Sequence, residues 1–144
     1  NKPEATAAAF SSDGFFRTGD IGYLDEDGYL FIVDRKKDII IRGGENISCP
    51  EVEAAAYEHD DIVELSVFGI VDDRYGEVPG MVYLAKDGAD MGPEKLREYL
   101  ASKLAPFKIP AHFWQVQEPL PRLGTQKIDR VTLRREYNDI AKAS

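Results

Sequence analysis

Strand-like apolar runs alternate with helical patterns from about residue 37 to the end of the chain. This alternation is the sequence feature that most restricts the possible fold classes. IVELSVFGIVD, from Ile62, and EVPGMVYLA, from Glu77, mix apolar and β-branched residues as strands do. A third strand candidate covers residues 113–116. Helical patterns surround these runs, at residues 48–60, 92–105 and 131–144. We therefore expect an α+β domain in which a short mixed β-sheet is flanked by helices.

Local signals support three of these elements. The helix that begins near residue 48 has Ser48 as its cap and Glu51 three residues later, as in a capping box. The helix at 92–105 is amphipathic, with leucines on one stripe and charges opposite. Pro79 cannot donate a backbone hydrogen bond, so it predicts that its strand lies near a sheet edge or a bulge.

Residues 1–36 have a different character, because they consist of short strands and turns. Asp25 to Gly28 form a turn signal between two apolar segments, which predicts a β-hairpin. A hairpin alone is too small to be stable. We therefore predict two domains: residues 1–36 as the β-rich tail of a larger N-terminal domain, and residues 37–144 as a compact C-terminal domain.

Composition excludes several classes of partner. The formal net charge of -8 argues against non-specific binding to nucleic acid or anionic lipid, since both need a basic surface. No apolar run approaches the roughly 20 residues of a membrane span, and no signal peptide is visible. Cys49 is the only cysteine, which fits a reducing compartment. We expect a cytoplasmic protein with no membrane span and no nucleic-acid partner.

Two stretches could bind a nucleotide. Asp20 follows a Thr18-Gly19 turn, where a carboxylate could accept hydrogen bonds from two sugar hydroxyls. DRKKDIIIRGGEN surrounds a short strand with basic residues and ends it with two glycines, an arrangement that could hold a phosphate. Neither standard glycine-rich nucleotide fingerprint is present. On spacing alone, a plain loop aspartate and a charged turn between strands remain the simpler interpretations.

No metal site or catalytic triad is indicated. His59 and His112 lie far apart in the sequence, and no pair of ligands has metal-binding spacing. Cys49 falls in the first turn of a predicted helix, where a packed and inert thiol is the simpler interpretation. No metal ligand is therefore assigned.

Lys127, in PRLGTQKIDR, is a compact cation that could stabilise negative charge as it develops on a phosphate or a carboxylate. It lies between Arg122 and Arg130 in an acidic chain. Taken by itself, it is most simply a solvated surface charge.

Three motifs are more informative together than any one of them is alone. FRTGD, DRKKDIIIRGGENISCPEVE and LPRLGTQKIDR, in this order, resemble the C-terminal part of the adenylate-forming superfamily. That superfamily contains acyl-CoA synthetases (AMP-dependent synthetases and ligases), adenylation domains of peptide synthetases, and luciferases. The stretch GYLDEDGYLFIVDRKKDIIIRGGENI is most similar to acyl- and aryl-CoA ligases.

The resemblance implies a two-step reaction in which ATP and a small-molecule carboxylate give an acyl-adenylate, and CoA then gives a thioester and AMP. It implies that Asp20 holds the ribose hydroxyls and that Arg35 contacts the nucleotide. Lys127 would be the catalytic lysine of the adenylation step. Mg²⁺ would accompany ATP, although this chain offers no dedicated ligands for it.

The resemblance also implies a moving domain. Lys37 matches the position of the hinge between the large and the small domain. Rotation about it would replace the lysine loop with the IRGGEN loop, in which Gly43, Gly44 and Glu45 would line the channel for CoA. The essential partner would be an N-terminal domain outside this chain, so we expect no ligase activity and no tightly bound cofactor in this piece alone.

One position departs from the superfamily. Gln126 stands immediately before Lys127, where a glycine is usual. If that glycine provides a positive φ, glutamine must adopt the same backbone conformation for Lys127 to keep its direction. Two other functions stay open at this point: an adenylation domain that loads a carrier protein, and a non-catalytic module that retains the fold.

Overall fold

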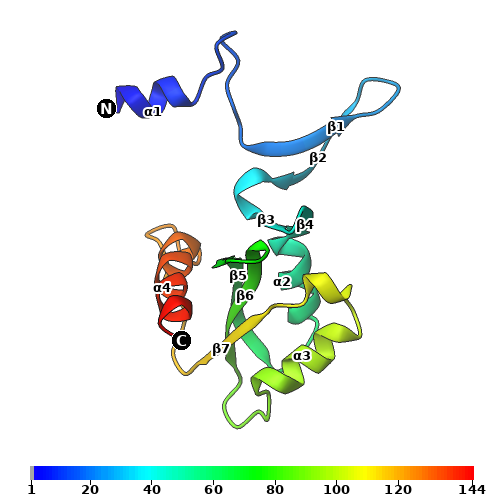
Figure 1. Cartoon of the computed structure of the whole chain (residues 1–144), viewed down its shortest axis with the longest axis vertical. Helices are drawn as coiled ribbons and strands as arrows, with labels where there is room; N and C mark the ends of the chain where they lie inside the picture. The colour runs from blue at the N-terminus through cyan, green and yellow to red at the C-terminus, as the bar shows by residue number, and fades with distance from the viewer. Residues whose placement is uncertain (1) are drawn as a thin grey trace. The chain divides into compact units, whose positions relative to one another are not determined.

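The computed structural model describes residues 2–144, except for the side chains of residues 33 and 34, and the chain forms two compact units (Figure 1). The first unit ends at Asp38, and the second extends from Ile39 to Ser144. Asn1, where the expected N-terminal segment begins, lies outside the described residues.

The first unit is built around the hairpin that the sequence predicts. Strand β1 (Asp20–Leu24) pairs antiparallel with β2 (Leu30–Arg35), and the 3-10 helix η1 (Lys36–Asp38) follows. In the turn, the Oδ1 atom of Asp25 accepts the backbone N–H groups of Asp27 and Tyr29 at 3.0 and 2.8 Å. A short helix, α1 (Pro3–Ala8), precedes the hairpin and was not expected.

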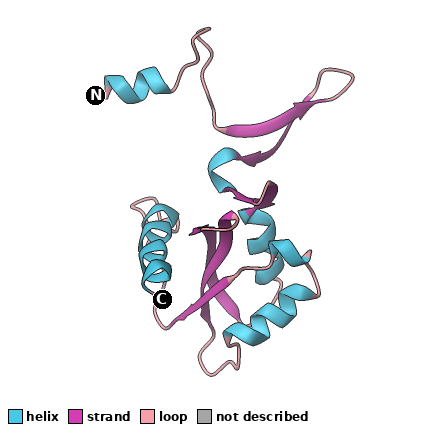
Figure 2. Ribbon diagram, viewed as in Figure 1, coloured by secondary structure: helices cyan, strands magenta, loops and turns pink. Residues whose placement is uncertain are grey.

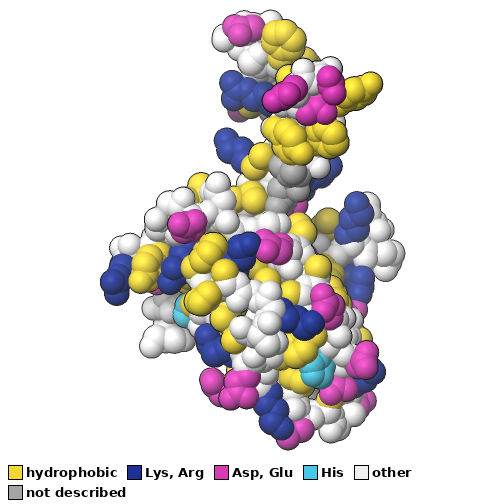
Figure 3. Space-filling model, turned by 90° about the vertical axis from the view of Figure 1, so that its right-hand side faces the viewer, with side chains coloured by type: hydrophobic (Ala, Val, Ile, Leu, Met, Phe, Trp, Pro, Cys, Tyr) yellow, Lys and Arg dark blue, Asp and Glu magenta, His cyan; other side chains and the backbone are white. Residues whose placement is uncertain are grey.

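Large apolar side chains lie at the surface of this unit (Figure 3). The most exposed are Phe15, Tyr29, Leu24, Leu30, Phe16 and Ile32, with 62 to 74% of their surface accessible. So many exposed hydrophobic side chains over one short hairpin mark a surface that normally has a partner.

The second unit contains the sheet and its covering helices (Figure 2). Its elements are β3 (Ile39–Arg42), β4 (Glu45–Ser48), α2 (Cys49–Tyr57), β5 (Ile62–Asp72), β6 (Gly76–Ala85), α3 (Pro93–Ala101), η2 (Pro106–Lys108), β7 (His112–Val116) and α4 (Arg130–Ala143). The strands lie in the order β4-β3-β6-β5, with β7 parallel to β6 and all other pairs antiparallel. The predicted α+β class with a mixed sheet is confirmed.

Helices cover both faces of this sheet (Figure 1). On one face, Val52 of α2 and Leu96 and Leu100 of α3 are fully buried against β5 and β6. On the other face, Leu133 of α4 is buried in a second cluster of apolar side chains, which Tyr137 joins from the same helix. The sheet is therefore the middle layer of three.

Two details of this unit differ from the expectations. Strand β4 was not predicted, because its residues were taken as part of a glycine loop. The inference that Pro79 lies near a sheet edge or a bulge is wrong: β6 is central, its pairing with β5 has no register shift at Pro79, and the partner on its other side changes from β3 at Gly76 to β7 at Gly80. Pro79 lies between these two pairings, where neither of those two partners is in register with it.

The start of α2 forms half of its expected capping box. The Oγ atom of Ser48 accepts the backbone N–H of Glu51 at 3.4 Å. The carboxylate of Glu51 instead binds the amine of Lys108, at 2.6 and 2.8 Å. Ser48 therefore caps the helix, while Glu51 links α2 to η2 through its ion pair with Lys108.

Among the residues that the structure describes, no helix is both long and apolar enough to cross a membrane.

Replacing Leu100 by alanine should lower the free energy of unfolding of the chain by about 2–5 kcal/mol, because the leucine is fully buried between α3 and the sheet. Urea denaturation followed by the fluorescence of Trp114, the only tryptophan, measures the change. Val131→Ala is the matched control, since Val131 is 82% exposed and should change stability by less than about 0.5 kcal/mol. Equal effects of the two substitutions would contradict the assigned core.

Candidate functional site

Asp20 and Arg35 lie opposite each other in the β1–β2 hairpin. They are register partners, and the Nε atom of Arg35 is 3.2 Å from the Oδ1 atom of Asp20. The N–H of Lys36 also donates to the carbonyl of Gly19, at 2.7 Å. The base of the hairpin therefore brings a carboxylate and a guanidinium into direct contact.

A hollow of about 490 Å³ adjoins this pair. It is lined by Thr18, Gly19, Arg35, Lys36 and Lys37. Three of these five residues are cationic, which favours an anionic ligand, and one of them, Arg35, also contacts Asp20. Lys37 itself is exposed in η1, two residues before the second unit begins.

Gly43 and Gly44 form the two-residue connection between β3 and β4. Their φ angles are 56° and 91°, and two positive φ angles in a two-residue hairpin loop are typical of a type I′ turn. The N–H of Gly43 donates to the carbonyl of Tyr75 at 2.8 Å, and the ring of Tyr75 lies 4.0 Å from the guanidinium carbon of Arg42. Glu45 begins β4 and is exposed. The predicted glycine loop is thus the tip of a hairpin.

Lys127 lies on an ordered loop between β7 and α4. The N–H of Leu123 donates to the carbonyl of Lys127 at 2.8 Å, and the N–H of Gln126 donates to the carbonyl of Leu123 at 2.9 Å. Leu120 and Ile128, on either side of the loop, pack into the apolar cluster beneath α4. These contacts leave the side chain of Lys127 exposed, at the residue that closes a short turn.

Gln126 has a φ angle of 66°, and within the described residues it is the only non-glycine residue with a positive φ. Glutamine therefore adopts the left-handed backbone conformation at the position where the superfamily usually has glycine. For an L-residue this costs about 1–2 kcal/mol relative to glycine.

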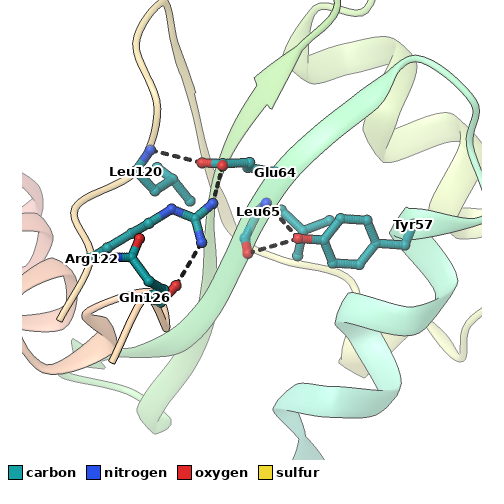
Figure 4. Close-up of polar contacts among 6 residues, drawn as sticks. All are labelled: Tyr57, Glu64, Leu65, Leu120, Arg122 and Gln126. Carbon is teal, nitrogen blue, oxygen red and sulfur yellow. Dashed lines mark hydrogen bonds and ion pairs between the residues drawn. The ribbon is translucent and has the colours of Figure 1, made fainter. Parts of the chain in front are cut away.

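Arg122 supports this strained residue (Figure 4). Its Nη1 atom donates to the carbonyl of Gln126 at 2.8 Å, and its Nη2 atom forms an ion pair with Glu64 of β5. The other carboxylate oxygen of Glu64 accepts the N–H of Leu120 at 2.9 Å. One carboxylate therefore anchors both the beginning of the loop and the arginine that holds its tip.

Sequence reasoning did not identify Glu64, although a signal for it exists. The register of β5 shifts between Ile62 and Glu64, so the strand contains a bulge. Ile62 faces the α2 side, and beyond the bulge Leu65 and Val67 face that side instead. The bulge thereby turns Glu64 toward the α4 side, as bulges re-aim side chains. A lone acid within a long apolar strand is the pattern that could have indicated it.

The far end of the loop has its own anchors. The Nη2 atom of Arg130 lies 2.7 Å from the Oε1 atom of Glu53 on α2, and that oxygen also accepts the N–H of Val67 at 2.9 Å. Asp129 caps α4 by accepting the N–H and the hydroxyl of Thr132, at 3.1 and 2.8 Å. These hydrogen bonds from Thr132 hold the pKa of Asp129 below its ordinary value.

The candidate residues thus form three groups. Asp20, Arg35 and Lys37 gather in the first unit, whereas the glycine turn and the Lys127 loop are separate features of the second unit. Across residues 2–144, with the stated exception of two side chains, no three His, Cys, Asp or Glu residues are grouped to hold a metal ion.

Comparison with known proteins identifies relatives of this chain. The model of the AMP-binding enzyme C-terminal domain matches residues 51–127. The chain is 46% identical over 134 residues to 2-succinylbenzoate–CoA ligase of Geobacillus kaustophilus (strain HTA426), covering 93% of this chain and 27% of that protein. It is also 46% identical over 139 residues to long-chain-fatty-acid–CoA ligase of Bacillus subtilis (strain 168), covering 96% of this chain and 24% of that protein.

A solved structure agrees with these matches. The crystal structure of ATP-bound MatB from Rhodopseudomonas palustris superimposes with a TM-score of 0.81 at 36% identity, over 97% of this chain and 28% of that one. The chain therefore spans about a quarter of the length of the curated relatives that it matches.

Replacing Gln126 by glycine should raise the free energy of unfolding by about 1 kcal/mol, because glycine accepts a positive φ without steric strain. Thr125→Gly is the matched control: Thr125 has no positive φ, so the added freedom of the unfolded chain should cost about 0.5–1 kcal/mol. Chemical denaturation measures both. Destabilisation by Gln126→Gly would contradict the strained loop.

The cap of α4 should make stability depend on pH. Since the pKa of Asp129 is lower in the folded state than its ordinary 3.8, its contribution is fully present above that ordinary value. It is lost as the pH falls through the lower, folded-state pKa. The melting temperature of Asp129→Ala should therefore lie below that of the wild type at neutral pH, and the gap should shrink in acid. Asp139→Ala, at an exposed position in α4, should show no such gap; a gap for Asp129→Ala that is constant with pH would refute the carboxylate's role.

Proposed function

The chain belongs to the family of AMP-binding enzyme C-terminal domains, and from this premise we propose that it is the mobile C-terminal domain of an ATP-dependent acyl-CoA ligase. The intact enzyme joins a carboxylate to AMP with release of pyrophosphate, and then transfers the acyl group to the thiol of CoA. The observation that carries this proposal is the exposed Lys127 on a closed loop whose backbone is held by hydrogen bonds.

Lys127 supplies positive charge to the first half-reaction. When the carboxylate attacks ATP, negative charge builds up on the oxygens of the α-phosphate, and a fixed amine beside them lowers the energy of that state. A lysine that already formed an ion pair would have to break it first. In the described part of the chain, no hydrogen bond or ion pair to the Lys127 amine occurs.

Asp20 and Arg35 bind the nucleotide in this proposal. Arg35 contacts one carboxylate oxygen of Asp20, and a carboxylate has enough acceptor sites to receive ribose hydroxyls as well. The basic residues Lys36 and Lys37 line the adjoining hollow, which favours an anionic ligand. Mg²⁺ would enter with ATP, because its usual ligands in such sites include the phosphates themselves.

Rotation about Lys37 links the two half-reactions. The lysine loop and the Gly43-Gly44 turn are different features of one unit, so a single orientation cannot serve two different reaction steps at one site. In the second orientation Gly43, Gly44 and Glu45 would line the channel for CoA, and glycines permit close approach of a ligand to the backbone.

A larger N-terminal domain is the partner that the proposal requires. Two observations support it: the chain spans about a quarter of its curated relatives, and the hairpin of the first unit exposes many large apolar side chains. That domain would supply the rest of the active site, including the pocket for the small-molecule carboxylate. A cytoplasmic location belongs to the same proposal, supported by the buried thiol of Cys49.

CoA is the proposed acceptor because both curated relatives are named CoA ligases. Their names differ in the carboxylate, a succinylbenzoate in one and a long-chain fatty acid in the other, at the same identity of 46%. The identity of the acid is therefore a property of the N-terminal domain in this account.

Lys127→Ala in the intact enzyme should reduce the rate of carboxylate-dependent pyrophosphate release about 10²–10³-fold, because one electrostatic donor is removed from the transition state. Formation of the thioester from supplied acyl-adenylate should be nearly unchanged. Lys86→Ala, which removes an exposed lysine from another loop, is the matched control and should leave both rates intact. An equal loss in both half-reactions with Lys127→Ala would rule out the assigned role.

A further inference from the structure

The amine of Lys127 does not fix its own position. It has no hydrogen bond or ion pair among the described residues, and its side chain is exposed. Its direction must therefore come from the backbone of the loop. A catalytic group displaced by about 1 Å can lose roughly 10²-fold in rate, so whatever holds this backbone matters for the reaction.

The backbone next to Lys127 is held by one chain of contacts. Glu64 binds Arg122, and Arg122 donates to the carbonyl of Gln126, the residue before the lysine (Figure 4). Gln126 is also the strained residue, with a φ of 66°. Arg122 therefore stabilises the one peptide unit whose conformation sets the direction of Lys127.

Partial burial distinguishes this contact from an ordinary surface ion pair. The side chain of Glu64 is only 16% exposed, and its second oxygen accepts the N–H of Leu120. Exposed ion pairs contribute little because both side chains are free to move. Glu64 lies on β5, the edge strand that pairs along its length with β6, and its contact with the Leu120 N–H fixes it further, so Arg122 has a rigid anchor.

Two other arginines have a similar arrangement, and comparing the three pairs shows what is particular to Arg122. Glu53 accepts the N–H of Val67 and pairs with Arg130, while Glu77 accepts the N–H of Ile41 and pairs with Arg134. Each carboxylate thus joins a backbone N–H to an arginine of the C-terminal segment. Arg122 in addition donates to a backbone carbonyl of the lysine loop, that of Gln126.

We propose that Glu64 and Arg122 are positioning residues for the adenylation step, which act by holding the Gln126 carbonyl and thereby aiming Lys127. This inference rests on the proposed role of Lys127. It also explains the arginine before the lysine: Arg122 is a structural strut and does not bind the nucleotide.

The strut can be tested on the 144-residue chain without any activity. The N–H groups of Leu123 and Gln126 are both hydrogen-bonded within the loop, so hydrogen exchange reports its closure. Arg122→Met and Glu64→Gln should each raise the exchange rates of these two amides about tenfold. Arg134→Met, which breaks the third pair on α4, is the matched control and should leave both rates unchanged.

Kinetics of the intact enzyme supply the second test. Arg122→Met and Glu64→Gln should lower kcat of carboxylate-dependent pyrophosphate release about 10²-fold, with little change in KM for ATP. The double variant should be no worse than either single one, because both remove the same strut. Arg122→Lys should recover little, since one ammonium does not reproduce a planar fork that reaches both the Glu64 carboxylate and the Gln126 carbonyl.

The possible outcomes distinguish a failure of this inference from a failure of the proposed role of Lys127. Full activity of Lys127→Ala would remove the proposed role of the lysine, whatever the strut does. Loss of activity in Lys127→Ala but not in Arg122→Met would overturn the strut alone. Equal losses in Arg122→Met and Arg134→Met, in kcat and in amide exchange, would overturn it too, by showing general destabilisation. An increase in KM without a fall in kcat would assign Arg122 to binding.

Discussion

The long antiparallel pairing of β5 with β6 is the interaction on which the rest of the second unit depends. It runs from Ile62 to Asp72 in one strand and from Gly76 to Ala85 in the other, and it separates two apolar clusters. The bulge near the start of β5 then decides which side chains face which helix. Without that single shift in register, Glu64 would face the α2 side and could not reach the loop before α4.

This pairing allows a small domain to carry a precisely directed but exposed lysine. An exposed side chain is easy to present to another domain and hard to aim. The loop resolves this conflict through the partly buried carboxylate of Glu64, which accepts the N–H of Leu120 and binds Arg122, the arginine that reaches the residue beside the lysine. The strain at Gln126 is accepted because its carbonyl is bound by Arg122.

The sequence predicted the class of the fold, the first hairpin and helices α2, α3 and α4, because their signals are local. Ser48 caps α2 as expected, and the leucines of α3 lie on one buried stripe. It did not predict β4, because two adjacent glycines are equally consistent with an open loop and a tight hairpin turn. It placed Pro79 near an edge or a bulge, because the change of partner along β6 depends on strands far away in the sequence.

The residues of the candidate site also differ in whether a local sequence signal identifies them. The motifs located Asp20, Arg35, Lys37, Gly43, Gly44, Glu45 and Lys127, and their roles stay predictions. The motifs did not include Glu64, whose role depends on a bulge and on a partner 58 residues later; only its position as a lone acid in an apolar strand could have indicated it. The sequence raised the question of whether Gln126 has a positive φ, and only the structure shows that it does.

Chemical restoration of the lysine tests the central claim most directly. In the intact enzyme, Lys127→Cys should abolish carboxylate-dependent pyrophosphate release, and alkylation of the new thiol with 2-bromoethylamine should rebuild a side chain with a terminal amine. Cys49 is 2% exposed and should stay unmodified, and mass spectrometry verifies where the label is. The account predicts that pyrophosphate release returns in proportion to the fraction of the introduced thiol that is alkylated. Complete modification without any recovery, or full activity before modification, would contradict it.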